Sequence, residues 1–158
     1  METTEITIER TYAATPDEVW RSWTTAEGIE SWWAPDGFAV EVRALEVRPG
    51  GELRYAMTAT APEQVAFMEK AGMLLTTESR KTFTDVVAAE RLAYDSLIDF
   101  VPGVDPYEIA TTVALHPEGE GVRIVMTVEP LHDKVWTGRL VMGRENEMDN
   151  LARVLAGG

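Results

Sequence analysis

The sequence predicts an α+β fold in which a curved antiparallel sheet of about seven strands wraps around a long C-terminal helix. Three observations predict this class: strand-like segments dominate residues 38–128, one long helical segment closes the chain, and two short helical segments follow the first strand. Strands and helices that are segregated along a chain are typical of antiparallel α+β proteins. The long helix must bury its apolar stripe, and a curved sheet is the surface large enough to cover it.

The chain begins with a strand-like segment, EITIERTY, in which apolar and polar residues alternate. The first short helix follows it. Thr15 can cap this helix, Pro16 suits its first position, and Glu18 completes a capping box. Trp20 and Trp23 fall on its apolar face, and we expect both to be largely buried.

The second short helix, TAEGIESWW, ends at a pair of tryptophans. Thr24 and Glu27 have capping-box spacing at its start. Neighbours on a helix point about 100° apart, so the two indoles cannot face the same way. Trp32 shares a face with Ile29, which predicts that Trp32 points inward and that Trp33 lies at the rim. The alternative is that both indoles are ordinary core.

Six strand-like segments follow, namely FAVEVRALEV, GELRYAMTAT, SRKTFTDVV, RLAYDSLIDFV, YEIATTVALH and VRIVMTVEP. RPGG is a turn signal between the first two, and PEGEG predicts a hairpin turn between the last two. We expect His116 to lie exposed beside that hairpin turn. Between the second and third strands, residues 64–71 predict a short helix that ends at Gly72.

The final helix is expected to run from Lys134 to Leu155, with Asp133 as its cap. Its apolar positions form a plausible core stripe: Leu140, Val141, Met148, Leu151, Ala152 and Leu155.

Composition limits the class of protein. The 158 residues suit a single domain, 1–158, and the absence of Cys excludes disulfides and thiolate chemistry. The net charge of −13 argues against nucleic acid as a partner. We find neither a membrane-spanning stretch nor a signal peptide, so a cytoplasmic location is expected. P-loop, Rossmann and G-x-S-x-G motifs are missing, and we expect no cofactor.

The order of these segments resembles the START-like superfamily, also called SRPBCC or the Bet v 1-like helix-grip fold. The closer resemblance is to its activator-of-heat-shock-ATPase-like (AHSA-type) bacterial branch. Five stretches carry it: TPDEVWRSWTTAEGIESWWAP, VRPGGELRYAM, AAERLAYD, VRIVMTVEP and MGRENEMDNLARVLA. Members often have Gly-Trp in the last helix where this chain has Gly143-Arg144, and residues 59–76 are longer than expected; both departures are expected to alter the cavity.

The resemblance implies a ligand cavity between the long helix and the concave face of the sheet. The two short helices would close one end of it. Alternation along each strand selects the side chains that share the apolar face, although plain packing explains the same pattern. The candidate cavity residues are Trp32, Trp33, Phe38, Tyr55, Met57, Tyr94, Phe100, Met126, Trp136 and Met148.

Titratable residues give weak signals for catalysis or metal binding. His132 precedes the last helix and can act as a base there, but no nucleophile or second base is identifiable beside it. Glu129, Asp133, Glu145 and Glu147 are close in sequence, and we interpret most of them as a solvated helix face. We therefore expect neither a catalytic set nor a metal site.

Two functions fit this reading. The first is a non-catalytic module that holds a small hydrophobic ligand, or a protein partner, in the cavity. The second is a START-like cyclase or hydrolase-type enzyme that uses cavity Tyr, His or carboxylate groups. The apolar residues of segment 59–76 predict either a cover for the cavity mouth or a homodimer contact. A chaperone partner is implied only by the name of the family.

Overall fold

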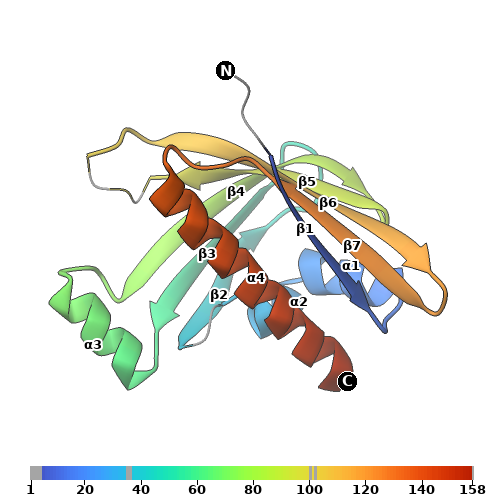
Figure 1. Ribbon diagram of the computed structural model, residues 1–158, viewed down its shortest axis with the longest axis horizontal. Coiled ribbons are helices and arrows are strands. Elements are labelled where there is room, and N and C mark those ends of the chain that lie inside the picture. The colour runs from blue at the N-terminus through green and yellow to red at the C-terminus, as the bar shows by residue number, and fades with distance from the viewer. Residues whose placement is uncertain (1–4, 35–36, 100, 102, 158) are drawn as a thin grey trace.

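The computed structural model describes residues 5–34, 37–99, 101 and 103–157, and it has the predicted α+β class. Figure 1 shows one curved sheet with a long helix lying across its concave face. The elements are β1 (Ile6–Tyr12), α1 (Pro16–Thr24), α2 (Ala26–Trp32), β2 (Phe38–Leu45), β3 (Glu52–Ala59), α3 (Pro62–Lys70), β4 (Thr76–Val87), β5 (Arg91–Ile98), β6 (Tyr107–Glu118), β7 (Gly121–Val128) and α4 (Lys134–Gly157).

The sheet has seven strands in the order β1-β7-β6-β5-β4-β3-β2, and every neighbouring pair is antiparallel. Strands β2 to β7 form a continuous meander, and β1 adds to the free edge of β7. This order keeps consecutive strands adjacent, as short connections favour. The predicted fold class is confirmed.

Helix α4 crosses the concave face, and its predicted apolar stripe holds it there (Figure 1). Met148 and Leu151 are fully buried in the main core. The Tyr12 hydroxyl of β1 donates to the Met148 carbonyl over 2.8 Å and links the edge strand to the helix. Within the described residues, no helix combines the length and apolar character needed to span a membrane.

The predicted capping box of α1 is present: Glu18 N–H donates to Thr15 Oγ1, and Thr15 N–H donates to the Glu18 carboxylate. One prediction for this region is wrong. The cap of α2 is Thr25, whose hydroxyl accepts from Gly28 N–H, whereas the Thr24 hydroxyl donates back to a carbonyl of α1. Trp23 is buried as expected, and Trp20 is partly buried and packs against the same core.

The β6–β7 hairpin is tighter than predicted. Strand β6 continues through Glu118, so the connection is only Gly119 and Glu120, and Gly119 has a φ of +60°. Such a φ suits glycine, which has no Cβ to clash. His116 therefore lies within β6, paired with Arg123 across the ladder, although its side chain is exposed as expected.

Helix α3 extends away from the sheet (Figure 1) and begins two residues earlier than predicted. It ends as expected, because Gly72 has a φ of +73° and Met73 N–H donates to the Met68 carbonyl. Met68 is buried, whereas Phe67, Met73 and Leu74 are 63, 49 and 75% exposed. We call these three exposed residues the α3 patch.

Candidate functional site

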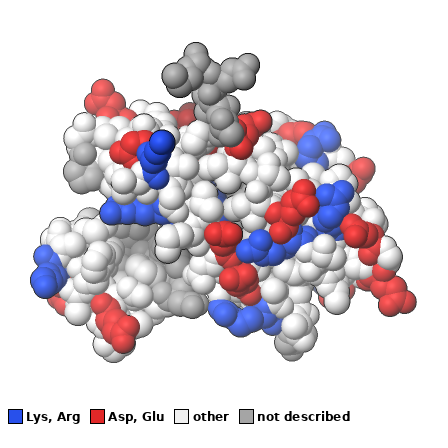
Figure 2. All heavy atoms as spheres, viewed as in Figure 1, with Lys and Arg blue, Asp and Glu red and all other residues white. Residues whose placement is uncertain are grey.

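A chamber of about 180 Å³ lies between the concave face of the sheet and the N-terminal half of α4. Its walls come from β3, β4, β5 and α4, and Figure 2 shows the surface hollowed between α3 and α4, with basic side chains along part of the rim. Exposed Arg80 and Arg139 line the chamber, so it reaches solvent. The lining consists of Tyr55, Ser79, Arg80, Lys81, Ser96, Leu97, Ile98, Arg139, Leu140, Gly143, Arg144 and Glu147.

The helix side of the chamber carries a buried ion pair. Arg144 and Glu147 are three residues apart on α4, and Arg144 Nη1 lies 3.3 Å from Glu147 Oε2. Their side chains are only 7 and 12% exposed. Glu147 is therefore an exception to the solvated helix face expected for most of the carboxylates in this region. Glu147 lies four residues before Leu151 and so shares the buried face of the helix.

The sheet side of the chamber carries a buried lysine. Lys81 of β4 is 6% exposed and is directly opposite Ser96 of β5 in the ladder. Lys81 Nζ donates to Ser96 Oγ over 2.9 Å. The same nitrogen lies 5.8, 5.8 and 5.4 Å from the ring centres of Trp33, Tyr55 and Tyr94, within the range of a cation–π contact.

Burial shifts the pKa values of these groups. Burial, together with the nearby Arg144 charge, lowers the pKa of Lys81 from 10.5 to about 7, although Glu147 opposes the shift. Burial raises the pKa of Glu147 above its ordinary value, against the influence of Arg144 and Lys81. Burial also raises the pKa of Tyr94 to about 12, which keeps the phenol neutral. The chamber thus contains an amine that is partly neutral near pH 7.

Several polar atoms in and behind the chamber have no hydrogen-bond partner among the described residues. They are the Tyr94 hydroxyl, Thr111 Oγ1, Arg144 Nε and, deeper in the core, Trp23 Nε1. Tyr94 and Thr111 are opposite each other in the β5–β6 ladder. A buried polar atom without a partner costs roughly 1–3 kcal/mol. Of these four residues, only Arg144 lines the chamber.

The predicted cavity residues fall into several surroundings. Tyr55 lines the chamber, and Trp33 and Tyr94 lie behind it around Lys81. Met126 and Met148 are fully buried in the main core, and Met57 is half-buried against it. Phe38 borders a separate outer groove with Trp32, and Trp136 packs on a second, smaller core. Phe100 lies outside the described residues.

The two tryptophans that end α2 are both buried, each with 2% exposure. The prediction that Trp33 lies at the rim is therefore wrong. Trp32 packs edge to face against Trp23, with ring centres 4.6 Å apart, and its Nε1 donates to the Ser22 carbonyl, which fixes it among the helices. Trp33 lies 6.1 Å from the ring of Tyr55 and faces the sheet. Trp33 is thus the indole beside the chamber.

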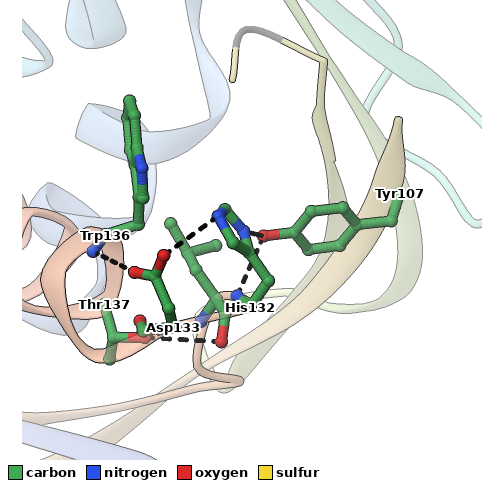
Figure 3. Close-up of polar contacts among 6 residues, drawn as sticks. Tyr107, His132, Asp133, Trp136 and Thr137 are labelled. Atoms are coloured by element: carbon green, nitrogen blue, oxygen red, sulfur yellow. Dashed lines mark hydrogen bonds and ion pairs between the residues drawn. The ribbon is translucent and has the colours of Figure 1, made fainter. Parts of the chain in front are cut away.

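A second polar cluster lies where β6 meets the start of α4. Figure 3 shows the Tyr107 hydroxyl against one side of the His132 ring and Asp133 on the other side. Tyr107 Oη is 2.6 Å from His132 Nδ1 and also accepts from the backbone N–H of His132. His132 Nε2 is 3.5 Å from Asp133 Oδ2, and Asp133 caps α4 by accepting from Trp136 N–H.

The other carboxylates near this cluster do not converge on it. Glu129 accepts from Ala110 N–H over 2.6 Å, and Glu145 is exposed. Within the described part of the chain, no group of three His, Asp or Glu residues is placed to hold a metal ion. The Tyr107–His132–Asp133 contacts mainly fasten the 129–133 loop to β6.

Sequence reasoning did not select Lys81, Ser96, Arg144 or Glu147 as site residues. Signals for two of them were present. Lys81 has the same strand parity as the buried Phe83, and so occupies an inward position. Arg144 stands out in the sequence only because relatives often have Trp at this position of the last helix. Neither signal predicts that Lys81 of β4 lies near Arg144 and Glu147 of α4, because their proximity depends on where α4 crosses the sheet.

The fold and this chamber define a helix-grip protein with a charged interior. A family model described as activator of Hsp90 ATPase homolog 1-like protein (AHSA1) matches residues 13–156, and the chain belongs to that family. No curated protein matches the sequence.

Solved structures of low sequence identity share the fold. A protein from Chromobacterium violaceum is 20% identical, with a TM-score of 0.77 over 96% of this chain and 97% of its own. The AHSA1-like protein from Aeromonas hydrophila is 20% identical, with a TM-score of 0.75 over 98 and 93%. The AHSA1 protein from Silicibacter pomeroyi is 16% identical, with a TM-score of 0.74 over 97 and 98%.

Proposed function

We propose that this protein is a binding module for a small amphiphilic acid, which occupies the chamber between α4 and strands β3–β5. One observation carries the proposal: a chain with a net charge of −13 lines this chamber with four basic residues and one acidic residue. The basic residues are Arg80, Lys81, Arg139 and Arg144, and the acidic residue is Glu147. Such a local excess of positive charge attracts anions.

The size of the chamber favours a small ligand. Its volume of about 180 Å³ is below the roughly 300–1,000 Å³ of most drug-sized ligand sites. A short-chain acid therefore suits it better than a long lipid.

The chemistry of the walls indicates how such an acid would lie. Tyr55, Leu97, Ile98 and Leu140 provide apolar surface for a short hydrocarbon chain. The carboxylate would approach Lys81 and Arg144, whose Nε has no partner among the described residues. Charge-assisted hydrogen bonds of this kind are stronger than neutral ones. A wholly apolar ligand would leave these donors unpaired.

Thermal unfolding with two matched probes tests the proposal. Pentanoate carries the acid, and 1-pentanol has a similar chain without the charge. We expect pentanoate to raise Tm in a concentration-dependent manner, since ligands that bind only the folded state stabilise it. Pentanol should have a much smaller effect. Equal effects of the two probes, or none from either, would contradict the proposal.

Two variants locate the binding. Lys81→Met should abolish the effect of pentanoate on Tm, whereas Lys134→Met, at an exposed position, should preserve it. Tryptophan fluorescence gives an independent measurement. A pentanoate-linked change should disappear in Trp33→Phe and persist in Trp32→Phe, because Trp33 is the indole beside Lys81.

A further inference from the structure

We propose that Lys81 is a nucleophile whose Nζ condenses with the carbonyl carbon of a small oxo acid held in the chamber, forming a Schiff base. This inference rests on the proposed function, because it requires an acid to bind there. It adds a covalent step and narrows the ligand to acids that also carry a ketone or aldehyde.

Lys81 contacts aromatic rings and lacks the close carboxylate partner that a structural buried ammonium normally has. A buried ammonium normally has a carboxylate partner and uses its three donors. Within the described residues, Lys81 Nζ has one hydrogen bond, to Ser96 Oγ, and no carboxylate within ion-pair distance. The nearest charges come from the Arg144–Glu147 pair across the chamber, and the two ions of that pair are already bound to each other.

The amine is also available in its neutral form. Burial and the Arg144 guanidinium lower its pKa to about 7, so a large fraction is unprotonated near neutrality. Desolvation and an adjacent cation are known means of activating a lysine toward carbonyl groups. Lys81 lines the chamber together with the exposed Arg80 and Arg139, and this is the route by which a small carbonyl compound would approach the nitrogen.

The condensation balances without any further reactant. The amine nitrogen adds to the carbonyl carbon, and the C–O bond of the resulting carbinolamine then breaks. The carbonyl oxygen leaves as water with the two amine hydrogens, and a C=N bond forms. Glu147 lines the same chamber as the carboxylate of the Arg144 pair, so it can accept a proton from the carbinolamine nitrogen and return it to the leaving oxygen.

The chamber also suits the product. The neutral imine takes up one proton from water to give the protonated Schiff base, a cation at the position of Nζ. The rings of Trp33, Tyr55 and Tyr94 surround that position at 5.4–5.8 Å, which favours a cation. Arg144 is left to bind the carboxylate of the same ligand, as guanidinium groups do well.

Reductive trapping tests this inference. The protein is incubated with 4-oxopentanoate and sodium cyanoborohydride at pH 7, and the adduct is located by peptide mass mapping. The chain has only three lysines, Lys70, Lys81 and Lys134, so assignment is direct. We expect Lys81 to be modified at least tenfold faster than Lys70 or Lys134, and Lys81→Arg to lose the fast adduct.

A second probe and a protein variant test whether the carboxylate of the ligand directs the reaction at Lys81. 2-Pentanone has the carbonyl without the acid and should react at least tenfold more slowly than 4-oxopentanoate. That preference should vanish in the paired Arg144→Met, Glu147→Met variant, in which an ion pair is replaced by two apolar side chains. Thermal unfolding of each variant shows whether it is folded.

The pH dependence of the trapping rate distinguishes a lysine with a lowered pKa from one that is merely accessible to the reagent. The titratable groups that face Lys81 Nζ are Arg144 and Glu147 from α4 and Tyr55 and Tyr94 from the sheet. The rate at Lys81 should level off just above pH 7, whereas the rates at the exposed lysines should keep rising.

If 4-oxopentanoate raises Tm but Lys81 is not selectively trapped, the Schiff base is refuted and the proposed function stands. If it neither binds nor reacts, both are refuted.

Discussion

The Lys81 chamber and the Tyr107–His132 cluster both join α4 to the sheet through polar side chains, but they differ in how completely those side chains are paired. In the cluster, the Tyr107 hydroxyl, both ring nitrogens of His132 and the Asp133 carboxylate have partners. In the chamber, Arg144 Nε has none among the described residues. Paired groups stabilise a fold, whereas unpaired buried groups need another explanation.

Burial sharpens this difference. The cluster is partly exposed, with 26% of the His132 side chain accessible, so solvent can complete its hydrogen bonds. Lys81, Arg144 and Glu147 are each less than 10% exposed as whole residues. Replacing such buried charges by apolar residues is often neutral or stabilising. This applies when both members of a pair are replaced together, so the presence of the Arg144–Glu147 pair is not by itself an argument for stability.

The largest effect is expected from breaking the buried ion pair. Glu147→Leu leaves the Arg144 charge uncompensated in the core, and we expect a loss of roughly 3–5 kcal/mol in the free energy of unfolding. Glu145→Leu, on the exposed side of the same helix, is the matched control and should change it little. Urea unfolding measures both. Equal effects would mean that solvent reaches Glu147 and that the chamber is not a buried site.

A second prediction concerns the pH dependence that Lys81 imposes. Its pKa is about 7 in the folded protein and 10.5 ordinarily, so between these values the unfolded chain binds the extra proton. Stability should therefore rise with pH across this window, by about 1.4 kcal/mol per pH unit. Below about pH 7 both states are protonated, and the full cost of burying the charge is present.

Lys81→Met removes this contribution. Compared with the wild type, the variant should be more stable at pH 6, and its advantage should shrink by roughly 3 kcal/mol between pH 7.5 and 9.5. Urea unfolding across this range, with Lys134→Met as the control, gives the difference. A constant advantage at all pH values would show that Lys81 titrates normally and would remove the electrostatic basis of the comparison.

The Tyr107 cluster should respond weakly and only in stability. Tyr107→Phe removes a hydroxyl that bonds to the ring and the backbone of His132, and we expect a loss of about 1 kcal/mol. The rise in Tm caused by pentanoate should be unchanged. If Tyr107→Phe instead weakened pentanoate binding, the cluster would be part of the site, and the distinction drawn from hydrogen-bond pairing would fail.

The same contrast explains what the sequence could predict. Strand alternation and capping motifs are local, so the sheet, the α1 capping box and the burial of Met148 and Leu151 follow from the sequence. His132 was noticed, but its partner Tyr107 lies 25 residues away, so their contact depends on how β6 meets α4. Lys81, in the same way, meets the helix charges only through tertiary packing.

The smallest effect on stability is expected at the α3 patch, which provides a reference outside both polar regions. Phe67, Met73 and Leu74 are largely exposed, so a Leu74→Ser change should alter the free energy of unfolding by no more than about 0.5 kcal/mol. Pentanoate binding and the trapping of Lys81 should also be unaffected, because the chamber is built from β3, β4, β5 and α4.

What Leu74→Ser should change is self-association. An exposed apolar patch of this kind commonly marks an interface, and a homodimer through residues 59–76 is our proposal for it. Light scattering coupled to size exclusion should show a dimer for the wild type and a shift toward monomer for Leu74→Ser, with Val135→Ser, an exposed apolar position on α4, as the control. A monomeric wild type would refute the homodimer. A loss of pentanoate binding in Leu74→Ser would instead show that the α3 patch contributes to the pentanoate site. The site would then extend beyond β3, β4, β5 and α4.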